Sequence, residues 1–406
     1  MKDNKESYNK TINDKIELNN DGLINNEKEN FNKNNEINNS IDIMNPLSFE
    51  LIHKVDLRHL SPGYNDFCKI IHVLSKKRLG LLSQNKLKII SLKSFKEIKI
   101  IQPNYNQLYS KRDILGNDFI DFKELKNQNI ILWTSNVILI YDKEYNLIQK
   151  IDEIEHGNIC ERKDYDYGTT TYYNINSIYE LTNGKLLSCN SYGLKFYEKN
   201  NNEYNLISTE KMEIDVHFAI ETKQNLLILL QKHYDEIYSD MEGDDKYLIS
   251  IYNIENKSLN IVFGTKVESI MGEFYRINFI NNKKYLFMCY GKTMKIFDLE
   301  KNMKLVNIEN ADDLYGKYEY KCGNYERIMK EEKRISKVLT NYSNTLFFGR
   351  DSNGNLKLYI FENNTLNIYY NFKEKNIDTV IKLKNNDFIA YSSDYQLYRF
   401  TPIFSK

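Results

Sequence analysis

The chain has 406 residues with 56 basic and 56 acidic side chains, so its formal net charge is zero. This balance argues against a nucleic-acid-binding protein that depends on bulk positive charge. The five cysteines are widely spaced and include no C-x-x-C pair, which argues against a disulfide framework or a zinc site. No run of about 18 apolar residues and no basic-plus-apolar leader is visible, so we expect a cytoplasmic or nuclear protein without a membrane span.

The N-terminal segment differs in composition from the rest of the chain. Residues 1–45 are dominated by Asn, Lys, Glu and Asp, with scattered isoleucines. Such a segment has too little apolar content to offset the entropy lost on ordering. We therefore predict a disordered tail over residues 1–45 and a folded domain over residues 46–406.

One unit recurs along the folded domain. It consists of an apolar strand, a polar turn, a second apolar strand, a short turn, and a third strand that ends in an aromatic residue; residues 175–198 read INSIYELTNGKLLSCNSYGLKFYE. Short apolar runs between polar turns are typical of β-strands, and self-similarity of this kind is typical of repeat folds. The seven copies cover residues 67–90, 120–142, 175–198, 216–253, 274–298, 335–361 and 377–400.

A fourth strand-like run follows each of the first six copies, at residues 98–101, 147–151, 206–208, 259–263, 304–308 and 366–370. Four strands per copy indicate a β-propeller blade. The seventh copy ends at Phe400 without a fourth strand, while an isolated run at residues 51–57 precedes the first copy. Because an open sheet edge exposes unpaired backbone groups, we predict that residues 51–57 complete the last blade.

The predicted fold is all-β: a seven-bladed β-propeller of four-stranded antiparallel blades, with the ring closed by an N-terminal strand. Only residues 325–337 look helix-like, with charges on most faces.

The ends of the third strands resemble WD40 repeats. In that family a Trp-Asp pair follows an apolar alternation and precedes a short turn and another strand. Phe297-Asp298 and Tyr141-Asp142 hold that place here, and Tyr197-Glu198 and Tyr252-Asn253 are looser versions. No Trp-Asp pair occurs, and the family's Gly-His near the start of each repeat is missing. The chain thus resembles a divergent WD40-like propeller over residues 51–402, and the resemblance implies a binding platform.

Motifs that would mark catalysis or metal binding are missing. The sequence has no sialidase-type Asp box, G-x-S-x-G, P-loop or H-E-x-x-H motif, and none of the six histidines has a second ligand at metal-binding spacing. His72 and His217 lie in first-strand patterns and are expected to be structural. Residues 351–355 read DSNGN, which lacks the acidic ligands of a calcium loop and predicts a hairpin turn. We expect no enzyme activity, no cofactor and no bound metal.

Four long connections interrupt the repeats, at residues 102–119, 152–174, 231–246 and 309–334. Three join a fourth strand to the next first strand and one joins a second strand to a third; in a propeller both kinds open on one face. Insertions on one face commonly mark a binding face, and Tyr and Arg are enriched in binding hot spots. The candidate partner-binding residues are Arg112, Tyr165, Tyr167, Tyr172, Tyr238, Tyr318, Tyr320 and Arg327.

The competing interpretation is that these tyrosines merely reflect a chain with 32 of them, and that the loops pack on themselves. Our main hypothesis is a non-catalytic scaffold that binds a protein or peptide, without nucleic acid or membrane. The alternatives are a propeller enzyme with a site at the central channel mouth, and a structural subunit of a stable assembly. The oligomeric state stays open.

Overall fold

The computed structural model describes residues 45–58, 70–83, 86–104, 119–153, 161–164, 168–171, 174–212, 215–223, 225–234, 245–267, 276–280, 285–290, 293–299, 301, 304–306, 317–321, 324–328, 335–343, 345–351, 354–383 and 385–404. The predicted disordered tail lies outside these residues except for Asn45. The chain divides into two compact units, with residues 1–41, 106–120 and 125–270 in the first unit and residues 42–105, 121–124 and 271–406 in the second.

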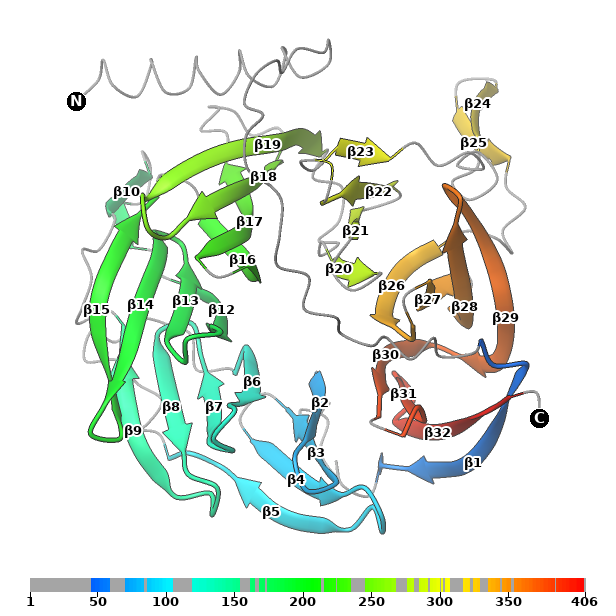
Figure 1. The fold of residues 1–406 in the computed structure, drawn as a ribbon, viewed down its shortest axis with the longest axis horizontal. Coiled ribbons are helices and arrows are strands. Elements are labelled where there is room, and N and C mark those ends of the chain that lie inside the picture. The colour runs from blue at the N-terminus through cyan, green and yellow to red at the C-terminus, as the bar shows by residue number, and fades with distance from the viewer. Residues whose placement is uncertain are drawn as a thin grey trace, which may run out of the picture. The chain divides into compact units, whose positions relative to one another are not determined.

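The first unit is built from antiparallel strands in sequential order (Figure 1). Its strands are β7 (Ile130–Trp133), β8 (Val137–Tyr141) and β9 (Leu147–Asp152); β12 (Ile175–Glu180), β13 (Leu186–Asn190), β14 (Gly193–Asn200) and β15 (Glu203–Lys211); β16 (Asp215–Lys223), β17 (Leu226–Tyr234), β18 (Asp245–Asn253) and β19 (Ser258–Val267). A separate two-stranded hairpin consists of β10 (Glu161–Asp164) and β11 (Gly168–Thr171).

The second unit repeats the same architecture. Its strands are β2 (Ile70–Leu74), β3 (Arg78–Leu82), β4 (Leu87–Ser91) and β5 (Glu97–Ile101); β6 (Asp121–Glu124); β20 (Arg276–Ile280), β21 (Tyr285–Tyr290), β22 (Thr293–Asp298) and β23 (Lys304–Val306); β26 (Ile335–Asn341), β27 (Leu346–Asp351), β28 (Asn355–Glu362) and β29 (Thr365–Lys375); and β30 (Ile377–Lys382), β31 (Phe388–Ser392), β32 (Gln396–Ile403) and β1 (Ser48–Asp56). A hairpin of β24 (Lys317–Lys321) and β25 (Asn324–Ile328) lies between β23 and β26.

Over the described residues, the strands form seven four-stranded antiparallel sheets: β2–β5, β6–β9, β12–β15, β16–β19, β20–β23, β26–β29 and β1-β32-β31-β30. The seven repeats and their six fourth strands are therefore confirmed, and the fold class is an all-β propeller of four-stranded blades. Second and third strands such as β7 and β8 are buried along their whole length, which is why they read as continuous apolar runs.

The closing strand is confirmed. β1 pairs antiparallel with β32, from Ser48 opposite Ile403 to Asp56 opposite Gln396, with an irregularity between Leu51 and His53. One sheet is thus made from both ends of the folded domain (Figure 1). Its edge is secured by packing as well as by backbone hydrogen bonds, because Phe49 contacts the rings of Tyr342, Tyr370, Phe372 and Phe388 at centroid distances of 5.2 to 5.6 Å.

The core is divided into clusters that lie between neighbouring sheets. Trp133 and Tyr197 belong to a buried cluster shared by β7–β9 and β12–β15. Phe348 and Phe388 belong to another, shared by β26–β29 and the closing sheet. Within each unit, these sheets therefore bury apolar faces against one another, as expected for repeat units that cannot bury their apolar surface alone.

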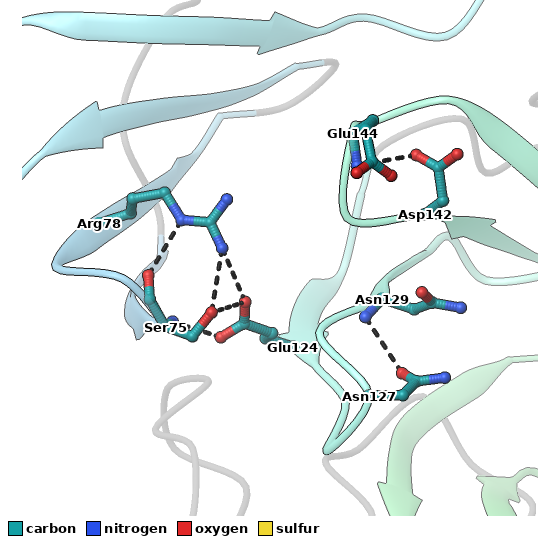
Figure 2. A network of polar contacts seen from close by, with 7 residues as sticks. All are labelled: Ser75, Arg78, Glu124, Asn127, Asn129, Asp142 and Glu144. Atoms are coloured by element: carbon teal, nitrogen blue, oxygen red, sulfur yellow. Dashed lines mark hydrogen bonds and ion pairs between the residues drawn. The ribbon is translucent and has the colours of Figure 1, made fainter.

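A recurring polar contact joins the hairpin turn of one sheet to the first strand of the next. Figure 2 shows one example, in which Glu124 at the end of β6 binds the turn after β2. The Glu124 carboxylate accepts hydrogen bonds from the Ser75 backbone N–H and from Ser75 Oγ (2.7 Å), and it pairs with Arg78 at 3.0 Å.

Two further glutamates make the same contact in the first unit. Glu180 accepts from the Lys126 N–H at 2.8 Å, and Glu221 accepts from the Thr182 N–H at 2.6 Å. Within the second unit Lys382 holds the corresponding place at the end of β30, and its ammonium group donates instead to the carbonyl oxygen of Tyr342.

The aspartates at the Trp-Asp place of the resemblance shape the third turn. Asp142 Oδ1 accepts a hydrogen bond from the Glu144 N–H at 2.9 Å and another from the Asn146 N–H at 2.8 Å. Figure 2 shows Asp142 and Glu144. Burial opposes ionisation of this carboxyl, but the hydrogen bonds hold its pKa below the usual value. Asn253 and Asp298 also accept backbone N–H groups of the turns that follow them. An oxygen acceptor at this position therefore closes the turn before the fourth strand.

The predicted hairpin turn at residues 351–355 is confirmed. β27 ends at Asp351 and β28 begins at Asn355, with the Gly354 N–H bonded to the Asp351 carbonyl at 3.1 Å. Gly354 has a φ of +80°, which glycine adopts without strain. The Asp351 carboxylate accepts from the Asn355 N–H at 2.8 Å and pairs with Lys357 at 2.9 Å. Its acidic group is thus satisfied by protein donors.

Two expectations about individual elements were wrong. The helix-like segment at residues 325–337 instead contributes to β25 and β26, because pairing with β24 and β27 outweighs helix propensity. The connection expected at residues 231–246 is shorter, since β17 extends to Tyr234 and β18 begins at Asp245. The insertion hairpins β10–β11 and β24–β25 were not predicted.

Candidate partner-binding site

Two connections of the first unit leave from the same end of adjacent sheets. β12 and β16 run in the same direction, because Asn176 Nδ2 donates to the Val216 carbonyl (3.0 Å) near their starts while Thr182 and Glu221 meet at their ends. β12 begins directly after the insertion at residues 154–173. The β17–β18 connection at residues 235–244 follows the end of β17, which pairs with the start of β16.

The connection before β6, which precedes Ile120, ends at the same end of the sheets as the other two connections. The Ile120 N–H bonds to the Trp133 carbonyl at 2.8 Å, and the Ile175 N–H bonds to the Ser135 carbonyl at 2.7 Å. Ser135 lies in the β7–β8 turn, so the residues after position 118, this turn and the start of β12 are neighbours. Three connections of the first unit therefore emerge from one end of its sheets. We call this the connection end.

Five of the eight candidate residues belong to these connections and lie outside the described residues: Arg112, Tyr165, Tyr167, Tyr172 and Tyr238. Their involvement in binding stays a prediction. What the structure describes is the base that carries them: β9 and β12 on either side of the insertion, and β17 and β18 on either side of residues 235–244.

The other three candidates lie in the β24–β25 hairpin of the second unit. The register places Tyr318 opposite Arg327 and Tyr320 opposite Tyr325. The sequence grouped Tyr318, Tyr320 and Arg327 without predicting the strands that bring them together.

A buried ion pair fixes the base of the insertion at residues 154–173. Lys195 of β14 and Glu153, which follows β9, have side chains that are 1% and 0% exposed. Lys195 Nζ donates to the Glu153 carbonyl oxygen at 2.6 Å and lies 3.6 Å from its carboxylate. The Glu153 N–H in turn bonds to the Asn136 carbonyl at 3.0 Å. The last described residue before the insertion is therefore held from two neighbouring sheets.

The electrostatics of this pair follow from its burial. Burial lowers the pKa of Lys195, while the negative charge of Glu153 opposes this shift. Burial and the nearby Glu153 carboxylate raise the pKa of Tyr197, which keeps its hydroxyl protonated. Sequence analysis missed this arrangement, although a lysine inside the apolar third strand GLKFYE was a usable signal. Lys88 and Lys357 occupy similar third-strand positions and are also buried.

The base of residues 235–244 is also ordered by a buried polar contact. Ser250 Oγ donates to Gln231 Oε1 at 2.6 Å, and both residues are fully buried. Elsewhere His72 Nε2 lies 2.9 Å from Asp121 Oδ1 and its ring packs against Phe122 at 4.9 Å, consistent with a structural histidine. Cys189 is buried, as expected of a core thiol.

Among the described side chains, no group of three or more His, Cys, Asp or Glu residues is placed to hold a metal ion. In the same part of the chain, no helix has the length and apolar character needed to cross a membrane.

Comparison with known proteins supports the fold. No protein-family model and no curated protein matches the chain. The WD40 domain of Pan2 from Neurospora crassa aligns with a TM-score of 0.54 at 10% identity, over 89% of this chain and 99% of that domain. A chain in the crystal structure of a mitotic checkpoint complex aligns with a TM-score of 0.52 at 8% identity, over 95% of this chain and 100% of that one. The fold is therefore that of a WD40-like β-propeller.

Proposed function

We propose that the protein is a non-catalytic scaffold that binds a protein or peptide partner through the connection end. The observation that carries the proposal is the convergence of three connections at one end of the first unit, on a base held by the buried Lys195–Glu153 pair. Rigid elements that present variable loops are a common way to build a recognition surface. The WD40-like fold and the occurrence of one structural neighbour in a multiprotein complex are consistent with this role.

Tyrosine and arginine are suited to such a surface. A Tyr side chain buries a large area, keeps a hydroxyl group for hydrogen bonding and loses little entropy on ordering. Tyr165, Tyr167 and Tyr172 belong to one connection and Tyr238 to another, so a partner at the connection end would meet more than one connection. The hairpin β24–β25 would supply a similar set on the second unit.

The proposal is tested by single substitutions in the full-length protein. Tyr165→Ala, Tyr167→Ala and Arg327→Ala should each weaken partner binding by about 1–4 kcal/mol if the side chain is an anchor. Partners are identified first by affinity purification with cross-linking mass spectrometry, and cross-links should map to the connections. Binding of the purified partner is then measured for each variant, with thermal melts to confirm folding.

The control is Lys143→Ala. Lys143 is exposed and lies in the β8–β9 turn, at the opposite end of its sheet from the connections. Its substitution should leave partner binding unchanged. If Lys143→Ala abolishes binding while Tyr165→Ala and Tyr167→Ala bind normally, the connection end is not the binding surface; Arg327→Ala tests the β24–β25 hairpin of the second unit separately.

A further inference from the structure

The turn between β2 and β3 has an unusual backbone for its sequence. Lys76 and Lys77 both have a φ of +56°, in the left-handed region that non-glycine residues rarely adopt. Where two consecutive described residues elsewhere share this conformation, both are asparagine: Asn201–Asn202 and Asn363–Asn364. Asparagine tolerates this region better than lysine does. A chain rich in asparagine therefore keeps two lysines at a place where asparagine would be less strained.

This strained turn is held rigidly from both sides. Ser75 and Arg78, which flank the two lysines, both bind the Glu124 carboxylate (Figure 2). Arg78 Nε also donates to the Ser75 carbonyl at 2.9 Å. Arg78 is buried while Lys76 and Lys77 are exposed. The positive charge of Arg78 is thus paired with Glu124 in the interior, whereas the charges of Lys76 and Lys77 are exposed at the turn.

A second turn of the same sheet adds to this charge. The Leu92 N–H bonds to the Lys77 carbonyl at 2.9 Å, so the β4–β5 turn lies beside the β2–β3 turn. That turn carries Lys93 and Lys96, which are exposed. None of the four lysines forms an ion pair with a described residue. Residues 70–101 contain seven lysines and Arg78 against the single carboxylate of Glu97, a net charge of +7 in a chain whose total is zero.

The geometry points to a second binding surface, formed by Lys76, Lys77, Lys93 and Lys96 at the turn end of sheet β2–β5, that takes an acidic segment of a protein partner. Charge complementarity identifies the partner's chemistry. The adjacent edge strand β5 exposes Ile98 (49%) and Ile100 (39%), and its outer backbone groups can pair with an extended peptide. This surface is independent of the connection end and lies at the opposite end of the sheet from residues 102–104.

A protein segment fits these features better than other polyanions. Single-stranded nucleic acids are usually held by aromatic residues that stack on bases, and the one aromatic residue of these two turns, Phe95, is buried. The fork of Arg78, which would suit a phosphate, is occupied by Glu124. An anionic lipid surface would offer no partner for the backbone edge of β5.

The test measures binding of a fluorescein-labelled decaglutamate peptide to the full-length protein by fluorescence anisotropy at low and physiological salt. Lys76→Asn/Lys77→Asn should raise the Kd by about tenfold and weaken its salt dependence, since two of four charges are lost. The melting temperature should stay equal or rise, because asparagine relieves the left-handed backbone. A loss of binding in this variant can therefore not be attributed to unfolding.

The matched control is Lys199→Asn/Lys211→Asn, which makes the same charge change at two exposed strand positions of the first unit. It should bind the peptide like the unsubstituted protein. Equal weakening in both variants would overturn the proposal by showing a bulk charge effect, as would normal binding by the turn variant. A single-stranded DNA oligonucleotide, or vesicles of phosphatidylcholine and phosphatidylserine, binding through Lys76 and Lys77 more tightly than the peptide would also overturn it.

Discussion

At the scale of single residues, one position is used repeatedly to tie neighbouring sheets together. Glu124, Glu180 and Glu221 each stand near the end of a first strand and accept the N–H of a preceding turn. A carboxylate suits this task because backbone N–H groups in a turn lack a ladder partner, and a charged acceptor makes a stronger hydrogen bond. The cation of Lys382 requires the opposite partner and finds the Tyr342 carbonyl.

Replacing Glu124 tests the strength of this contact. The Arg78 and Glu124 side chains are only 9% and 12% exposed, so Glu124→Ala leaves a largely buried guanidinium without its carboxylate. We expect the free energy of unfolding to fall by about 3 kcal/mol, measured by urea titration. Glu144→Ala is the comparison: its pair with Lys143 is exposed, and its loss should cost less than about 0.5 kcal/mol. Equal effects of the two substitutions would contradict the assignment.

The buried Lys195–Glu153 pair predicts a different pattern. Lys195→Met leaves the fully buried Glu153 carboxylate uncompensated and should destabilise the protein by about 3–5 kcal/mol. Adding Glu153→Leu removes the stranded charge and should restore most of that loss. Urea unfolding of the two single variants and the double variant gives the coupling energy. If the losses simply add, the two groups do not act as a pair.

At the scale of elements, strands were predictable and the inserted hairpins were not. Inner blade strands such as β8 have apolar residues at buried positions, so the sequence pattern predicts them; β8 reads VILIY and is buried throughout. β10 and β11 read ERKD and GTTT, with no apolar alternation to mark them. Residues 325–337 carry helix-forming residues but contribute to β25 and β26, because the adjacent strands β24 and β27 supply hydrogen-bond partners.

The closing strand makes the sharpest prediction at this scale. Deleting residues 1–45 should leave the melting temperature nearly unchanged, because β1 begins at Ser48. Deleting residues 1–58 removes β1, exposes the edge of β32 and takes Phe49 out of its aromatic cluster. The longer truncation should therefore unfold or aggregate, as followed by thermal melts and size-exclusion chromatography. Similar melting temperatures for the two truncations would show that closure by β1 contributes little.

At the scale of the whole molecule, the fold could be predicted from the sequence more completely than the candidate site. The same unit occurs seven times, so weak copies such as residues 67–90 could be aligned with strong ones. All of the blade strands were therefore predicted. The site has no such redundancy. The Lys195–Glu153 pair and the paired turns of Lys76–Lys77 and Lys93–Lys96 join residues far apart in sequence or depend on backbone angles. A lysine inside the apolar strand GLKFYE signals the buried pair, but no local pattern identifies Glu153 as its partner or places the two lysine turns side by side.

Two buried tyrosines, Tyr141 and Tyr252, make the free energy of unfolding fall at alkaline pH. Burial raises the pKa of Tyr141 to about 12, and burial together with Glu210 raises that of Tyr252 to about 12. An unfolded tyrosine titrates near pH 10, so the folded state favours the neutral form. This contribution is complete below pH 10 and is lost as the pH rises from 10 to 12, at about 1.4 kcal/mol per pH unit for each tyrosine.

Urea unfolding at pH 9 and pH 11 measures this loss, and Tyr141→Phe isolates one tyrosine. Phenylalanine cannot ionise, so the fall in stability between the two pH values should be smaller in the variant by about 1.4 kcal/mol. The subtraction matters because lysines also begin to lose their charge in this range, and they do so in both proteins. Tyr145→Phe is the control, since Tyr145 lies in the β8–β9 turn and is only partly buried, and its replacement should leave the pH dependence unchanged. An identical fall in stability for the original protein and Tyr141→Phe would mean that the Tyr141 hydroxyl ionises equally well in the folded and unfolded states.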